Sequence, residues 1–142
     1  MKVYQRGDII FMEMPTSPES HVQGGMRPWV VVQNNIGNRH SPTTIVCPLT
    51  TKLKRLEMPT HVPIAWDSLE ISMVMCEQVR VVDVTPDWKY VCTLPKEIMH
   101  HIDRALSAAF FFEGGGRHLR GYRRGEVVIC CPLNFQRPIV SC

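Results

Sequence analysis

The sequence predicts a small, mainly β domain in which a strongly bent sheet or barrel is closed by one C-terminal helix. Three observations lead to this fold class. Short runs of β-branched and aromatic residues alternate with turn residues up to about residue 82. One later stretch has apolar residues at three- and four-residue spacing, which is typical of an amphipathic helix. The length of 142 residues fits one domain.

Six runs are expected to form strands, and turn residues separate them. In chain order they cover residues 8–14, 28–33, 43–49, 60–64, 72–76 and 78–82. The first follows a turn at Arg6-Gly7-Asp8, and residues 34–39 read as a turn or a short helical turn. Because Pro63 has no amide hydrogen to donate to a ladder, the fourth run suits an edge strand.

A long loop is predicted over residues 15–25, where two prolines and two glycines lie among small polar residues. Loops of this length in a compact domain are usually functional or mobile. It leads directly into the second strand.

The helix is predicted over residues 95–112. Its apolar face comprises Ile98, Ile102, Ala105, Leu106, Ala109 and Phe110. Pro95 suits the first turn of such a helix, and the three glycines at 114–116 end it.

Charge is distributed unevenly between two segments. Residues 1–113, the expected barrel domain, hold 11 Lys and Arg against 12 Asp and Glu. Residues 114–142, a basic tail expected to be peripheral or poorly ordered, hold five arginines against Glu126. Any nucleic-acid binding by the domain must therefore use a local site. The Arg117–Arg124 stretch could add phosphate affinity, although a solvated charge run is the simpler interpretation, and residues 127–131 could add a strand.

Several functional classes find no support in the sequence. No apolar run approaches the ~20 residues that span a bilayer, and no secretory pattern opens the chain, so a cytoplasmic protein is expected. The six cysteines contain no C-x-x-C pair and are expected to be reduced. No Cys/His spacing suits zinc, so no metal or cofactor is expected. Walker and G-x-S-x-G motifs are absent.

Two places could carry chemistry. Arg27 follows paired glycines and enters a buried strand, where a guanidinium can grip a phosphate bidentately. The alternative is a structural arginine that pairs with a neighbouring carboxylate. Thr50 ends another buried strand, where its hydroxyl could bond a phosphate oxygen, and the alternative is a turn-forming threonine.

Six fragments of the chain, taken in order, carry a family resemblance. They are Arg6-Gly7-Asp8-Ile9, Gln23-Gly24-Gly25-Met26-Arg27-Pro28, Val32-Gln33-Asn34, Asn38-Arg39-His40-Ser41-Pro42-Thr43, Pro59-Thr60-His61-Val62 and Glu77-Gln78-Val79-Arg80-Val81-Val82-Asp83. In this order and spacing the chain resembles the PemK/MazF family of toxin endoribonucleases, also called mRNA interferases, from about Arg6 to Phe112.

The resemblance implies an SH3-like β-barrel with a C-terminal helix, usually as a homodimer. It implies metal-independent cleavage of single-stranded RNA at a short sequence, and a cognate antitoxin that occupies the RNA groove and forms a DNA-binding complex with the toxin. The family's catalytic arginine and threonine fall on Arg27 and Thr50.

The resemblance also suggests roles for other residues. Gln23, Thr51, Lys52, His61 and Gln78 are candidate RNA contacts. No general base is assigned, and His61 is one candidate. Many members carry an acidic residue immediately before the Gln-Gly-Gly motif, whereas this chain has Val22 preceded by His21. The resemblance therefore leaves two alternatives open: a non-catalytic barrel toxin of the gyrase-poisoning type, and an inactivated relative that acts as a binding protein.

Overall fold

The computed structural model of the chain describes residues 2–111, 126–131 and 135–141. The chain divides into two compact units, Met1–Phe112 and Glu113–Cys142. In the second unit, strands β8 (Glu126–Cys131) and β9 (Phe135–Ser141) pair as an antiparallel hairpin. The Arg117–Arg124 stretch and the three glycines that were expected to end the helix lie outside the described residues.

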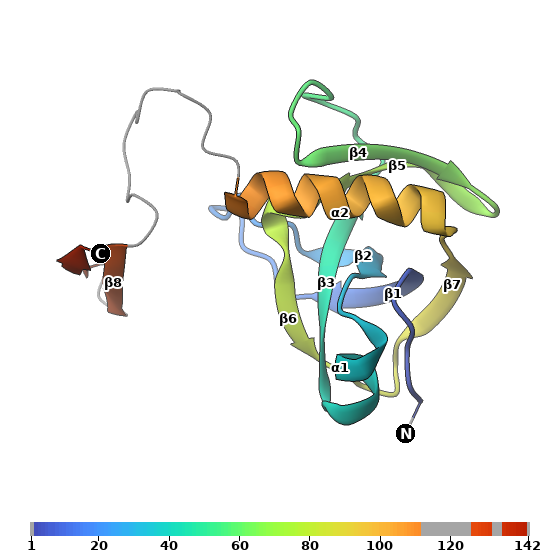
Figure 1. The fold of residues 1–142 in the computed structure, drawn as a ribbon, viewed down its shortest axis with the longest axis horizontal. Helices are drawn as coiled ribbons and strands as arrows, with labels where there is room; N and C mark the ends of the chain where they lie inside the picture. The colour runs from blue at the N-terminus through green and yellow to red at the C-terminus, as the bar shows by residue number, and fades with distance from the viewer. Residues whose placement is uncertain (1, 112–125, 132–134, 142) are drawn as a thin grey trace. The chain divides into compact units, whose positions relative to one another are not determined.

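Seven strands of the first unit form one antiparallel sheet, with a helix across it (Figure 1). The elements are β1 (Asp8–Met14), β2 (Gly25–Val31), helix α1 (Asn35–His40), β3 (Thr43–Thr50), β4 (His61–Trp66), β5 (Leu69–Met75), the 3-10 turn η1 (Cys76–Gln78), β6 (Arg80–Asp83), β7 (Lys89–Thr93) and helix α2 (Lys96–Phe111). All six expected strands are present, with each bound displaced by at most three residues. The mainly β fold with a C-terminal helix is confirmed.

The sheet is bent because β3 changes its pairing partner along its length. The first part of β3 pairs with β6 and its end pairs with β5, while β2 occupies its other edge. The outer strands β4 and β7 approach each other, and Trp66 Nε1 donates a hydrogen bond of 3.1 Å to the carbonyl oxygen of Thr93. The expected barrel is therefore bridged by a side chain where a closed barrel would have a ladder, and β4 is an edge strand as expected.

The central strands are buried on both faces, and each face contributes to its own core. Ile9 belongs to a cluster that includes Leu49 and Ile102, while its neighbour Ile10 belongs to a cluster around Trp29. All five of these side chains are fully buried. Two-sided burial explains why the strand sequences read as continuous apolar runs.

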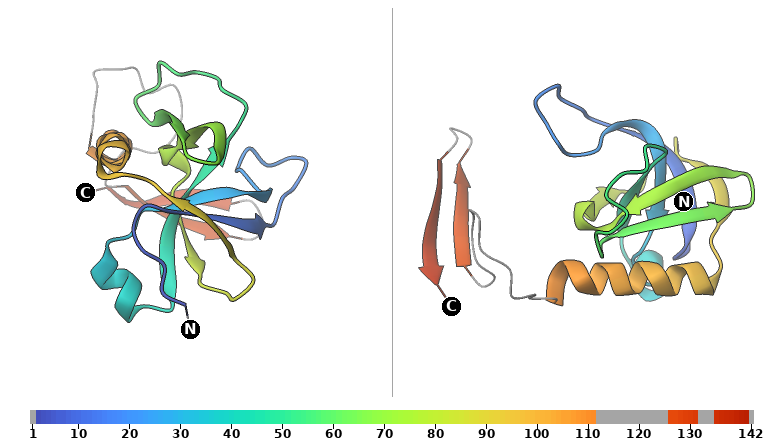
Figure 2. Two further views of the ribbon diagram at one scale, coloured as in Figure 1. Left: turned by 90° about the vertical axis from the view of Figure 1, so that its right-hand side faces the viewer. Right: turned by 90° about the horizontal axis from the view of Figure 1, so that it is seen from above.

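Helix α2 lies across the sheet, as Figures 1 and 2 show. Ile102 and Ala105 of the predicted apolar face are buried, and the Arg6 guanidinium pairs with Asp103 on the same helix. Ala109 and Phe110 were expected on this face, but both are exposed because the last turn lies beyond the buried cluster. No helix in the described ranges is long and apolar enough to span a membrane.

Strand β7 is the element that the sequence did not predict. Only Cys92 of its five residues is buried, so the run lacks the apolar pattern that marks the other strands. Cys47, Cys76 and Cys92 are buried free thiols. The pKa of the Cys47 thiol is raised by its hydrogen bond with Cys76 and by burial, so this thiol stays protonated and packs as a small apolar group.

Replacement of Ile102 by alanine is expected to destabilise the first unit by about 2–5 kcal/mol, because it leaves a cavity where α2 meets the sheet. Urea denaturation followed by circular dichroism measures this change. Ile36→Ala is the matched control, since the Ile36 side chain is 67% exposed. Equal midpoints for the two variants would show that α2 is not held by this contact.

Candidate functional site

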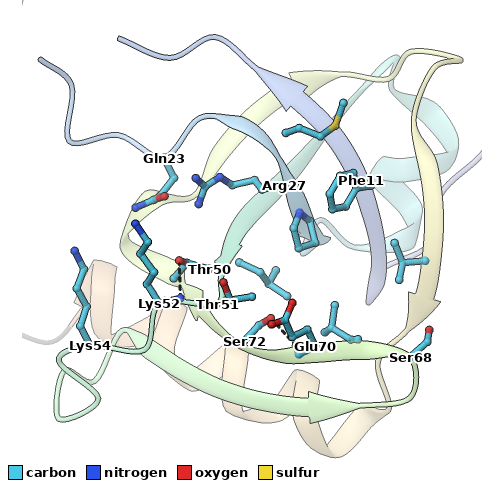
Figure 3. Close-up of a pocket in the computed structure, with 15 residues that line it drawn as sticks. Phe11, Gln23, Arg27, Thr50, Thr51, Lys52, Lys54, Ser68, Glu70 and Ser72 are labelled. Carbon is cyan, nitrogen blue, oxygen red and sulfur yellow. Dashed lines mark hydrogen bonds between the residues drawn. The ribbon is translucent and has the colours of Figure 1, made fainter. Parts of the chain in front are cut away.

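A cavity of about 590 Å³ opens beside the ends of β2 and β3 (Figure 3). The residues that line it are Phe11, Gln23, Met26, Arg27, Pro28, Leu49, Thr50, Thr51, Lys52, Lys54, Ser68, Leu69, Glu70, Ser72 and Val91. Its charged side chains are three basic ones and one acidic one. The cavity is therefore suited to a ligand with negative charge and some apolar surface.

The register of the sheet brings Arg27 and Thr50 together. Trp29 of β2 pairs with Pro48 of β3 at the end of the β2–β3 ladder, and Arg27 and Thr50 each lie two residues beyond this pair on their own strands. Both residues line the cavity, together with Gln23, Thr51 and Lys52 (Figure 3). Five of the seven predicted site residues thus meet at one place.

Two glycines shape the backbone that carries Arg27. A Cβ at Gly24 would lie 2.5 Å from the carbonyl oxygen of Pro15. The two ends of the loop can therefore approach this closely only because residue 24 has no side chain. Gly25 has φ +75°, which glycine adopts without strain. Arg27 Nε donates a 2.7 Å hydrogen bond to the Gly24 carbonyl oxygen, which aims the guanidinium.

Among the residues that the structure describes, Arg27 has no carboxylate partner of the kind that a structural arginine would have. The ion pairs within the described part of the chain join Arg6 to Asp103 and His61 to Glu77. Burial lowers the pKa of the Arg27 guanidinium from its ordinary value, but arginine remains charged at neutral pH. Its terminal nitrogens are therefore available to an anionic ligand in the cavity.

Thr50 combines a turn with a free donor. Its Oγ1 accepts a 3.2 Å hydrogen bond from the Lys52 backbone nitrogen, which is the turn contact that the alternative interpretation expects. Within the described residues the hydroxyl proton has no acceptor, so Thr50 can still donate to a ligand oxygen.

Gln78 was predicted to contact the ligand, but it is not among the residues that line the cavity. Its Oε1 accepts a 2.7 Å hydrogen bond from the Gln23 backbone nitrogen, and its Nε2 donates to the His21 carbonyl oxygen at 3.4 Å. The side chain thus fastens the 15–24 loop to η1. Its place in the structure is that of a positioning residue.

His61 was predicted as a ligand contact and a candidate base, but it lines a different cavity, between β4 and α2. The side chain is buried, and Nε2 lies 2.9 Å from Glu77 Oε1. Nδ1 lies 3.0 Å from the Arg55 carbonyl oxygen. Both ring nitrogens have partners outside the Arg27 cavity, so the structure does not bring His61 together with Arg27 and Thr50.

Several lining residues were not singled out from the sequence, among them Phe11, Lys54, Glu70 and Ser72. Phe11 and Ser72 sit inside predicted strands, where their type suggests only packing. Lys54 and Glu70 are exposed charges with no motif around them. Strand pairing brings Phe11, Glu70 and Ser72 to the cavity, and Lys54 reaches it from the segment between β3 and β4. No local sequence signal indicates these placements.

Comparison with known proteins extends the picture. The sequence model of a family described as PemK-like, MazF-like toxin of type II toxin-antitoxin system matches residues 5–110. The chain is 36% identical over 107 residues to Endoribonuclease EndoA of Bacillus subtilis (strain 168). That alignment covers 73% of this chain and 91% of the relative.

Solved structures show the same fold. MazF (Form-I) from Deinococcus radiodurans matches with a TM-score of 0.64 at 20% identity, covering 76% of this chain and 96% of that one. An endoribonuclease in complex with its cognate antitoxin from Mycobacterial species matches with a TM-score of 0.60 at 22% identity, covering 75% and 93%. At these identities the likeness establishes the fold alone.

Gln78→Ala is expected to release the 15–24 loop, because it removes the acceptor of the Gln23 amide. Amide hydrogen exchange at Gln23 should become faster, while exchange in β2 stays unchanged. Gln5→Ala is the control, since the Gln5 side chain is exposed. Unchanged exchange at Gln23 would show that the loop is held by other contacts.

Proposed function

Because the chain belongs to the PemK-like, MazF-like toxin family of type II toxin-antitoxin systems, we propose that it is a sequence-specific endoribonuclease that cuts single-stranded mRNA. The relative from Bacillus subtilis is named an endoribonuclease. The observation that carries the proposal is the meeting of Arg27 and Thr50 in one cavity, with Lys52 and Lys54 beside them. A toxin that acts by contact alone would not need this pair.

The chemistry uses the nucleophile that RNA itself carries. The 2′-OH attacks the adjacent phosphorus, a new O2′–P bond forms, and the P–O5′ bond breaks. The products are a 2′,3′-cyclic phosphate and a 5′-OH, after the 2′-OH has lost its proton and the leaving oxygen has gained one. The protein has to align the three atoms and stabilise the charge that develops on the phosphoryl oxygens.

Arg27 and Thr50 suit these two tasks. The guanidinium of Arg27 can donate two parallel hydrogen bonds to the non-bridging oxygens, and no carboxylate in the described residues competes for it. The Thr50 hydroxyl donates to a non-bridging oxygen and fixes its position. Arginine is a poor general base because its pKa exceeds about 12, so Arg27 acts as stabiliser and donor.

Three side chains bring to the cavity the positive charge that metal-dependent nucleases obtain from a metal ion. Arg27, Lys52 and Lys54 line the cavity and supply the electrostatic stabilisation that phosphoryl transfer needs. The proposed reaction therefore proceeds without a metal.

The same charges suit an acidic segment of a cognate antitoxin, and one of the structural relatives is described in complex with its cognate antitoxin. A homodimer is part of the same proposal.

Arg27→Ala is expected to lower the cleavage rate by about 100- to 1,000-fold or more, because it removes the main donor to the transition state. The assay incubates a long unstructured RNA with the protein in EDTA and maps new 5′-OH ends. Arg39→Ala is the control, since Arg39 is exposed and lies outside this cavity. No cuts by the folded wild-type protein would contradict the proposal and favour a toxin that acts by contact.

Thr50→Val is expected to slow cleavage by about 10- to 150-fold, the cost of one hydrogen bond to a charged group. Thr50→Ser keeps the hydroxyl and should retain most of the activity. Single-turnover rates on an RNA from the mapping experiment measure both. Equal rates for the valine and serine variants would remove the hydroxyl from the mechanism.

A further inference from the structure

The cavity has two ends of different chemistry. Figure 3 shows Gln23, Lys52 and Lys54 on one side and Phe11, Ser68 and Glu70 on the other. The first end, near Arg27, carries the positively charged side chains that suit phosphate. The second end, which we term the acidic end, is formed by Phe11, Ser68, Glu70 and Ser72 and lies beside β1 and β5.

The carboxylate of Glu70 is the one acidic side chain among the residues that line the cavity. It forms no ion pair, since the pairs in the described ranges involve Asp103 and Glu77. Ser72 is buried and its hydroxyl donates a 2.7 Å hydrogen bond to the Glu70 carbonyl oxygen, which fixes the backbone that presents the carboxylate. This end repels phosphate and requires a ligand with hydrogen-bond donors.

An RNA base next to the scissile phosphate supplies such donors. Unpaired bases in RNA are read on their Watson–Crick edges and stack on aromatic side chains. Phe11 offers a partly exposed ring at the acidic end. A carboxylate accepts two hydrogen bonds side by side, and its best match is an edge with two parallel N–H donors.

Guanine is the base that has this edge. Its N1–H and N2–H₂ groups point the same way, whereas adenine and cytosine set one amino group beside a ring nitrogen that repels a carboxylate. Uracil sets its single N–H between two carbonyl oxygens. A site built on an acceptor pair therefore discriminates by attraction to one base and by repulsion of the others.

We propose that the acidic end is a guanine-binding subsite of the RNA cavity, in which Glu70 accepts from N1–H and N2–H₂ while Phe11 stacks on the base. The inference rests on the proposed ribonuclease function and adds its substrate preference: a guanine at one fixed position beside the cut. Glu70 acts as a specificity residue and takes no part in the bond changes.

The test measures binding separately from cleavage. Fluorescence anisotropy is recorded with 2′-deoxyuridine heptamers, which lack the nucleophile, carrying guanine, inosine or uracil at the centre. The guanine heptamer should bind about 5- to 150-fold more tightly than the uracil heptamer. Inosine, which keeps N1–H and lacks the amino group, should fall between them.

Two variants test whether Glu70 is the residue that recognises guanine. Glu70→Gln replaces one acceptor with a donor and should abolish the preference for guanine, whereas Glu70→Asp should retain part of it. Glu97→Gln is the matched control, because Glu97 is an exposed carboxylate on α2 that does not line the cavity. Sequencing of 5′-OH ends from wild type and Glu70→Gln should show guanine enriched at one position only in the wild type.

The outcomes separate the two proposals. Equal binding of the three heptamers, or an unchanged preference in Glu70→Gln, would overturn the guanine subsite whether or not the protein cuts RNA. A guanine preference that depends on Glu70 in a protein without cleavage would support the subsite and contradict the ribonuclease function. Cuts without guanine enrichment would support the function and contradict the subsite.

Discussion

Burial of both faces of the central strands is the constraint on which the rest of this structure depends. Ile9 and Ile10 are neighbours in sequence and lie in different cores, and both are fully buried. A polar side chain within such a strand must find a partner, as Thr44 does by donating to Asn38 Oδ1 at 2.7 Å. Arg27 and Thr50 lie near strand ends and face a cavity, where a ligand can reach their polar groups.

The same constraint makes the site rigid on one side and adjustable on the other. Arg27 and Thr50 lie on strands β2 and β3, which pair in one sheet, so both side chains are carried by anchored backbone. The 15–24 loop is fixed by fewer contacts: the crowded backbone at Gly24 and the hydrogen bonds of Gln78. A ligand would therefore meet two donors carried by strands beside a loop that is held by few contacts.

How much the sequence predicts follows from the range of the interactions involved. Strands 8–14 and 43–49 carry their signal in consecutive β-branched residues, and Arg27 and Thr50 follow from a family resemblance. Strand β7 was missed because an edge strand needs few apolar residues, and its pairing with β1 spans most of the chain. Gln78 hydrogen-bonds to the 15–24 loop, and His61 hydrogen-bonds to Glu77. No rule of sequence spacing predicts these partners. Glu70 has no motif around it, and only the pairing of β5 with β3 brings it to the cavity.

The division of charge within the cavity bears on the direction in which a nucleic acid can lie. Arg27 and the two lysines attract phosphate, and Glu70 repels it, so a chain entering with its backbone toward Glu70 meets an unfavourable field. The opposite placement satisfies both ends at once, because the phosphate then lies at the arginine and lysine side chains and the hydrogen-bond donors of a nucleobase lie at the Glu70 carboxylate. A domain whose first 113 residues are close to neutral has no large field to hold RNA in many registers. In the proposed function, selection of one RNA register would fall to a few groups of opposite sign within a single cavity, by rejection of wrong sequences as well as by attraction to the right one.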